Sequence, residues 1–351
     1  MARIVLIGAG EDLLEALLKA LEARGVARDA VRVPGASDPM FDDESVSGPP
    51  SRELRAWLDR VRPEDLHDAE IAVVVGAAER AVQLAPIARE AEVILVDATG
   101  GGFSNGGTLV FPGLTTELLA EVELGDWLAL PQPGTAGLLM ALAPIQELSP
   151  LVRVVVTVLR PASVRGGRAI EELSGQAVER LGGRALEPEQ RGRVLAFGLR
   201  PVLASVSDGS NPAATMAAET RILLGTAAPL VSASIIDAGV FAGIVLAVHL
   251  ETERPLDINE VAGALARTAG IRLAGQVPLG GDEEEGVIAM LADPAPGPVE
   301  VMGSLALHVA GLETDLDLPA GLRFFLVFDD RLRGLVVPLA DLLERLLGRD
   351  D

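Results

Sequence analysis

The first part of the chain alternates short apolar runs with segments in which apolar residues recur at helical spacing. The runs predict strands at residues 2–8, 30–35, 70–78 and 92–102. Helices are predicted at 11–25, at 51–63 and in the alanine-rich stretch that ends near Ala91, and an acidic, proline-rich loop occupies 35–50. Strands separated by helices at this spacing predict a parallel, doubly wound α/β sheet.

From about Leu151 the pattern changes, and strands and helices no longer alternate regularly. Strands are predicted at 151–159, as a pair within 229–250, and at 321–330. Helices are predicted at 163–183, 211–225, 258–270 and 333–349. This arrangement predicts a second domain of the α+β class, with a sheet that is available for a subunit interface.

The apolar stretch from Pro229 to Leu250 has the length of a membrane span. Asp237 lies in its middle, Gly239 and Gly243 interrupt it, and its Ser, Val and Ile residues favour strands. We therefore expect two buried strands joined by a turn, and no membrane partner.

Composition narrows the class of protein. Hydrophobic residues make up 49% of the 351 residues, aromatic residues only 3%, and tyrosine is absent, so the cores must be aliphatic, which suits buried parallel strands covered by helices. The formal net charge of −22 opposes a phosphate-rich partner, so nucleic-acid binding is not expected. The single lysine, Lys19, restricts Schiff-base and P-loop chemistry to one predicted helix.

The chain contains no cysteine, which excludes disulfides, thiolate catalysis and zinc–thiolate sites. His67, His249 and His308 are far apart and have no metal-ligand spacing, so we expect no metal site. His249 falls within an apolar strand, where a core position is expected. The opening segment MARIVLIGAG is too short and too soon broken by glycine to be a signal peptide, so we expect a cytoplasmic protein.

The stretch LPQPGTAGLLMALAPI at 130–145 predicts an apolar helix that starts directly after Pro-Gln-Pro-Gly-Thr. Enzymes often place a nucleophile at such a helix N-terminus, because the helix dipole favours negative charge there. This segment contains no nucleophile of that kind, although it is predicted to form the helix.

A series of landmarks runs along nearly the whole chain: the opening strand with Gly8 and Ala9, DATGGGF from Asp97, LVFPGL, PQPGTAGLLMALAPI, VVVTVL, AETRIL and FDDRLRG. Their order resembles that of the aspartate-semialdehyde dehydrogenase family. The resemblance implies an NADP-dependent enzyme of amino-acid biosynthesis with two domains. They would be a Rossmann-like nucleotide-binding-type domain at 1–130 plus 330–351, with the C-terminal helix packed on it, and an α+β substrate and dimerisation domain at 131–329.

In that family the loop and helix carry Asn-Cys-Ser-Thr, and the cysteine attacks the aldehyde carbon of the substrate. The equivalent residues here are Gln132, Pro133, Gly134 and Thr135. Proline has neither a nucleophile nor a backbone N–H. The family reaction is therefore not expected.

The other chemical positions implied by the resemblance differ as well. The substrate-carboxylate arginine corresponds to Asp237, which reverses the charge and is expected to repel an anionic substrate. The general-base histidine corresponds to Ile244, after Gly243, and the lysine of the family's EExK helix corresponds to Thr215.

The turn that binds the cofactor in the family reads GAGEDLL here. Gly8, Ala9 and Gly10 remain, together with Thr135, as the candidate cofactor-binding residues, but Glu11 and Leu14 replace the second and third glycines of GxxGxxG. Glu11 places an anion where a phosphate would lie, and the loop expected near the 2′-phosphate is acidic, with Asp38, Asp42, Asp43 and Glu44. We expect no cofactor, with NADP as the alternative.

An intact scaffold without its nucleophile resembles the noncatalytic, Usg-type paralogues of the family. The first hypothesis is accordingly a homodimeric pseudoenzyme that binds a protein or metabolite. The second is an enzyme with a rebuilt site that uses Thr135, Asp97, Ser104 or His249, although Thr135 would also suit a helix cap and Asp97 a bond to the glycine loop. The third is a subunit that partners an active paralogue or a larger assembly.

Overall fold

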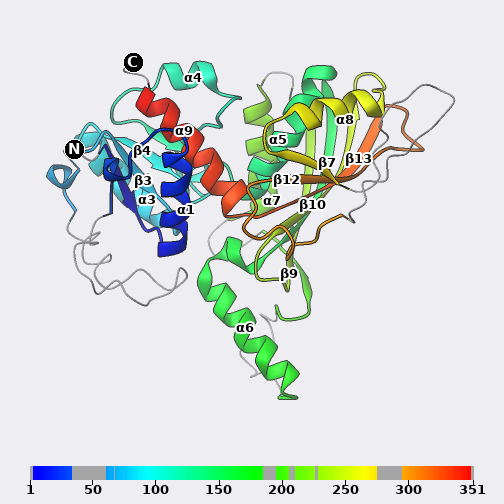
Figure 1. Ribbon diagram of the computed structural model, residues 1–351, viewed down its shortest axis with the longest axis horizontal. Helices are drawn as coiled ribbons and strands as arrows, with labels where there is room; N and C mark the ends of the chain where they lie inside the picture. Colours follow the sequence, from blue (N-terminus) through cyan, green and yellow to red (C-terminus); the bar gives the residue numbers. More distant parts are fainter. Residues whose placement is uncertain are drawn as a thin grey trace. The chain divides into compact units, whose positions relative to one another are not determined.

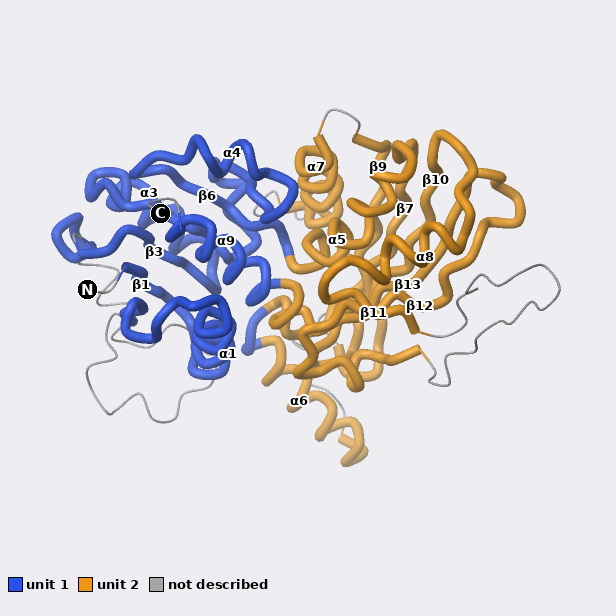
Figure 2. Tube along the Cα trace, turned by 45° about the horizontal axis from the view of Figure 1, so that its top comes forward, with its two compact units in different colours: residues 1–132, 166–168, 335–351 blue, residues 133–165, 169–334 orange. Residues whose placement is uncertain are grey.

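The computed structural model describes residues 3–33, 61–66, 68–184, 195–204, 210–225, 228–274 and 295–348. The predicted acidic loop at 35–50, most of the predicted helix at 51–63, and His67 lie outside these residues. The chain divides into two compact units, which are coloured separately in Figure 2. Unit 1 comprises residues 1–132, 166–168 and 335–351, and unit 2 comprises residues 133–165 and 169–334.

Unit 1 is built on a six-stranded parallel sheet in the order β2-β1-β3-β4-β6-β5, as the alternating pattern predicted. Its strands are β1 (Ile4–Ile7), β2 (Val31–Arg32), β3 (Ile71–Val74), β4 (Ile94–Asp97), β5 (Thr108–Leu109) and β6 (Trp127–Ala129). Its helices are α1 (Glu11–Glu22), α3 (Ala78–Glu90), α4 (Thr116–Ala120) and α9 (Val337–Leu347), with short 3-10 turns η1 (Arg28–Ala30), η3 (Pro63–Asp65) and η4 (Phe103–Asn105).

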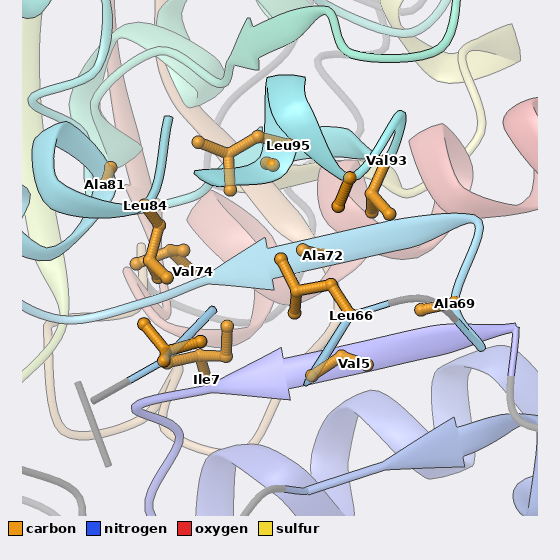
Figure 3. Close-up of a cluster of buried hydrophobic side chains, with 13 residues drawn as sticks. Val5, Ile7, Leu66, Ala69, Ala72, Val74, Ala81, Leu84, Val93 and Leu95 are labelled. Carbon is orange, nitrogen blue, oxygen red and sulfur yellow. The ribbon is translucent and has the colours of Figure 1, made fainter. Parts of the chain in front are cut away.

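Burial of the central strands on both faces holds this unit together. Every residue of β1, β3 and β4 is buried, which is why these strands appear in the sequence as unbroken apolar runs. On one face, Val5, Val74 and Leu95 of the strands pack against Leu84 of α3 and Leu66 (Figure 3).

The C-terminal helix α9 belongs to unit 1, as predicted, and packs against α1. Arg24, just beyond the end of α1, donates hydrogen bonds of 2.8 Å and 2.5 Å to Asp341 of α9. Helix α9 is thereby tied to α1 within unit 1.

Unit 2 contains a mixed seven-stranded sheet in the order β11-β12-β13-β10-β7-β9-β8 (Figure 1). Its strands are β7 (Leu151–Arg160), β8 (Leu199–Pro201), β9 (Leu230–Ala238), β10 (Ile244–Thr252), β11 (Ile271–Ala274), β12 (Leu307–Thr314) and β13 (Gly321–Phe328). Its helices are α5 (Pro133–Leu148), most of α6 (Gly167–Leu181), α7 (Pro212–Leu224) and α8 (Ile258–Arg267), with the 3-10 turn η5 (Ala162–Arg165), while the π-helical turn η8 (Leu332–Val336) leads into α9.

The structure corrects the pairing predicted for residues 229–250. The two strands exist as β9 and β10, but they do not pair with each other, because β7 lies between them. It pairs in parallel with β9 and antiparallel with β10. Strand β7 offers both of its edges, and a short connection in the sequence does not specify which neighbour a strand takes. Among the described helices, none is long and apolar enough to cross a membrane.

Candidate functional site

The first turn of α5 lies where the sequence suggested a nucleophile platform. The helix begins at Pro133, earlier than the sequence indicated, because proline is favoured at the first helical position. Gln132, which precedes it, and Pro133 are half-buried, whereas Gly134 and Thr135 are buried. Thr135 is therefore inside the helix and is not its cap, which corrects the sequence-based expectation.

Thr135 instead connects two helices. Its Oγ1 donates a hydrogen bond of 2.5 Å to Oε2 of Glu219 on α7, and both residues are fully buried. The hydroxyl of Thr135 is thus committed to a bond inside unit 2. Sequence inspection had used the AETRIL segment only as a landmark and had not identified Glu219.

Three apolar side chains lie near Gly134, in the same first turn. A Cβ atom placed on Gly134 would lie 3.4 Å from Cδ1 of Ile244, 3.9 Å from Cε of Met216 and 4.0 Å from Cγ1 of Val158. The structure thus brings Ile244 beside Gly134, while Thr215 is half-buried on α7 next to Met216. None of the side chains that meet Gly134 here can act as an acid, a base or a nucleophile.

Asp237 is surrounded by arginines that no pattern in the sequence groups with it. It is 3% exposed and accepts hydrogen bonds of 2.8 Å from Arg160 and 3.0 Å from Arg200, while NH1 of Arg165 lies 3.7 Å from its Oδ2. Burial alone would raise the pKa of Asp237, but the hydrogen bonds and charges of these arginines lower it below its usual value. Three guanidinium groups therefore lie around this one buried carboxylate.

The turn before Ile244 is fixed by a second buried carboxyl. The backbone N–H of Gly243 donates to Oδ1 of Asp330 at 2.9 Å, and the hydroxyl of Ser163 donates to Oδ2 at 2.8 Å. Gly243 has a φ of +87°, which favours glycine. Burial raises the pKa of Asp330, and the two hydrogen bonds only partly oppose that rise.

In unit 1, the candidate cofactor turn follows β1. Gly8 has a φ of +86°, Gly10 precedes α1, and Glu11 is the exposed first residue of that helix. A side chain on Gly8 would collide with the guanidinium of Arg80, on the first turn of α3, and with the carbonyl oxygen of Val75. Arg80, which sequence inspection did not single out, is 9% exposed and brings a buried cation to the same turn as Glu11.

The other residues of the rebuilt-enzyme hypothesis belong to two different units. In unit 2, His249 is exposed on the face of β10 opposite to Ile244, so the expected core position is wrong. In unit 1, Asp97 is fully buried and accepts the Thr99 N–H at 2.8 Å, as expected, and burial raises its pKa. Ser104 is exposed on η4.

Among the described residues, no three His, Asp or Glu side chains are arranged to hold a metal ion. His308 is half-buried on β12, and its pKa is lowered by burial and by the charge of Arg272.

The fold and the order of the sequence landmarks indicate a class of protein. Residues 142–333 match the family described as "Semialdehyde dehydrogenase, dimerisation domain", which covers more than half of the chain. The chain belongs to the semialdehyde dehydrogenases, and within them to the aspartate-semialdehyde dehydrogenase family.

The individual relatives agree with this class. Aspartate-semialdehyde dehydrogenase 2 of Vibrio cholerae is 28% identical over 62% of this chain and 65% of its own length. A "USG-1 protein homolog" of Azotobacter vinelandii is 26% identical over 82% of this chain and 83% of its own length. The crystal structure of aspartate semialdehyde dehydrogenase II from Vibrio cholerae, complexed with ASA, has the same fold, with a TM-score of 0.77 and 24% identity over 98% of this chain and 97% of that one.

Proposed function

We propose that this protein is a noncatalytic, cytoplasmic member of the aspartate-semialdehyde dehydrogenase family that acts as a homodimeric binding or scaffold protein, in the manner of the Usg-type paralogues. The observation that carries the proposal is that the side chains nearest to Gly134, in the first turn of α5, are apolar. Ile244 and Met216 approach Gly134 at the place that the resemblance assigns to the nucleophile, its neighbours and the general base.

The chemistry supports this interpretation. Attack on an aldehyde carbon requires an activated nucleophile, and a thiolate is the group that the family uses. The chain has no cysteine at any position, and Pro133 stands at the assigned position. The hydroxyl of Thr135, two residues further along the helix, is buried and bonded to Glu219. Loss of a nucleophile alone typically lowers kcat by several orders of magnitude.

The first test is turnover. Purified full-length protein is incubated with aspartate semialdehyde, phosphate and NADP, and formation of NADPH is followed, with the Vibrio cholerae relative as the active control. We expect a rate equal to the buffer blank. A rate above the blank that persists after further purification would show that the protein is an enzyme, and the proposal would be abandoned.

A titration with NADP and NADPH addresses the cofactor separately. We expect no binding at micromolar concentrations, because Glu11 opposes a phosphate at the N-terminus of α1 and the turn lacks two glycines of the family pattern. Micromolar binding would favour cofactor sensing or an enzyme with a rebuilt site.

The homodimer is supported by the second face of the seven-stranded sheet. Helices α5 and α8 pack on one face. On the other face, Thr157, Ala247, Phe325 and Ala310 stand opposite one another on neighbouring strands. Phe325 is 50% exposed in the middle of this row. A stable interface of the obligate type buries about 2,000 Å² or more, and such a face is suited to supply it.

Analytical ultracentrifugation of the wild type and of two variants tests the dimer. We expect a dimer at micromolar concentration, which Phe325→Asp converts to monomer. The control is Leu316→Asp, because Leu316 is also apolar and is 93% exposed between β12 and β13. A monomeric wild type would contradict the homodimer, and a complex that forms only with an active paralogue would favour the partner-subunit alternative.

A further inference from the structure

Two histidines flank Phe325 on one face of the seven-stranded sheet. His308 of β12 stands opposite Val327 of β13. His249 of β10 stands opposite Arg323 of the same strand. Val327 and Arg323 each lie two residues from Phe325, so they and the two histidines are on the face that carries Phe325. That is the face from which the proposed homodimer is built.

His308 has a cationic neighbour on the edge strand of this sheet. Arg272 of β11 is its partner in the strand register, and β13 offers the apolar Val327 on the other side. Partial burial and the charge of Arg272 both lower the pKa of His308 below its ordinary value. Protonation of this imidazole therefore places a second positive charge beside an arginine.

His249 also has an arginine as a neighbour, and the carboxylates nearest to it have arginines of their own. Arg323 stands opposite His249 on β13 and forms an ion pair of 2.6 Å with Glu313 of β12. Glu251, two residues further along β10, stands opposite Arg153 of β7. The residue of β7 opposite His249 is a valine. Neither described histidine therefore has a carboxylate directly opposite it on a neighbouring strand.

An interface centred on Phe325 would cover both imidazoles. A stable interface of the obligate type buries about 1,000 Å² on each protomer, which corresponds to a patch of about 18 Å radius. Two residues along a strand span only about 7 Å, and neighbouring strands are about 5 Å apart. Burial of an ionised imidazole is costly unless it gains a partner of opposite charge. Such an interface is therefore favoured when both histidines are neutral.

We infer that association of two copies through this face is controlled by pH, and that protonation of His308 and His249 separates them. The inference rests on the proposed homodimer and adds a form of regulation to it. An imidazole ordinarily gains its proton near pH 6.5, so the change falls between neutral and mildly acidic conditions. The dimer binds fewer protons than two separate protomers, so association weakens as the pH falls.

The net charge of the chain would act in the opposite direction. Two copies with a formal charge of −22 each repel one another at neutral pH. Acid reduces that negative charge, which by itself would strengthen association. A dimer that weakens in mild acid is therefore not explained by net charge.

Analytical ultracentrifugation of the full-length protein at pH 7.5, 6.5 and 5.5 and constant ionic strength measures the dissociation constant of the dimer. We expect that constant to rise by about tenfold or more from pH 7.5 to 5.5, because each proton released on association contributes a factor of up to about ten per pH unit. Heats of dilution in buffers of different ionisation enthalpy measure the protons directly. Dissociation of the wild type near pH 6 should take up protons.

Histidine variants locate the effect. The double variant with His308→Gln and His249→Gln keeps polar side chains that do not titrate. It should remain a dimer at pH 7.5, and its dissociation constant should change by less than about threefold over the same pH range. His67→Gln is the matched control, because it removes the third histidine of the chain, which belongs to unit 1. It should keep the full pH dependence.

Equal dimer affinity at pH 7.5 and pH 5.5 would overturn the inference and leave the proposed homodimer intact. A pH dependence that the double variant retains would do the same. A wild type that is monomeric at pH 7.5 would contradict the homodimer itself, and the inference with it. Uptake of protons by the wild type is measured without any substitution, so the test does not depend on the folding of a variant.

Discussion

Thr135 on α5 and Glu219 on α7 form a hydrogen bond of 2.5 Å between two fully buried side chains. Removing a hydrogen-bond donor from a buried carboxyl group destabilises the folded protein, because that carboxyl group has already given up its hydration by water. We therefore predict that Thr135→Val lowers the free energy of unfolding by about 1 to 3 kcal/mol, as measured by urea denaturation. Thr215→Val serves as the control, because Thr215 is half-buried on α7, the helix that carries Glu219. Its free energy of unfolding should stay within about 0.5 kcal/mol of the wild-type value. Equal stability of the wild type and Thr135→Val would show that the bond contributes nothing.

Gly137 allows α5 to approach β13. A Cβ atom at this position would collide with the ring of Phe328, which is itself fully buried. Gly137→Ala should destabilise the protein by about 1 to 3 kcal/mol, because an overfilled core forces side chains and backbone apart. Gly175→Ala is the matched control, since nothing lies within 4 Å of the added carbon on α6. There the same substitution should stabilise by about 0.5 to 1 kcal/mol. Thermal unfolding of the two variants should therefore shift in opposite directions.

Asp237 should make the protein less stable in acid. Its pKa in the folded state lies below the ordinary value of 3.8, so its contribution is fully present above pH 3.8 and is lost as the pH falls through the folded pKa. Asp237→Asn should destabilise the protein at neutral pH by about 1 to 3 kcal/mol, with allowance for the partial exposure of the arginines. It should also remove that part of the acid dependence. If this assignment is wrong, the free energy of unfolding measured from pH 3 to pH 7 will depend on pH in the same way for Asp237→Asn and for the wild type.

Asp330 should make the protein less stable as the pH rises. Its folded pKa is raised by burial, so its favourable state is present below pH 3.8 and is lost as the pH rises through the folded pKa. Asn at this position keeps an acceptor for the Gly243 N–H and carries no charge. The stability of Asp330→Asn relative to the wild type should therefore increase between pH 4 and pH 8. A constant difference over that range, in the same denaturation experiment, would contradict the raised pKa.

Much of the architecture was determined by the sequence alone. Continuous apolar runs such as Ile4–Ile7 and Ile71–Val74 predicted a parallel sheet, because strands buried on both faces have no polar positions. Helical spacing identified α1, and the order of landmarks indicated the family. The absence of cysteine likewise excludes the thiolate chemistry of the family, whatever the arrangement of the folded chain.

The tertiary structure decided which residues are neighbours. The sequence did not show that β7 separates β9 from β10, that Thr135 lies inside a helix, or that His249 is exposed, because strand pairing and facing depend on the whole sheet. Nor could it reveal that Arg160 and Arg200 meet Asp237 across adjacent strands. The sequence gives the charge of each residue. The electrostatic environment of that residue depends on the charges that folding brings beside it, and these come from distant segments of the chain.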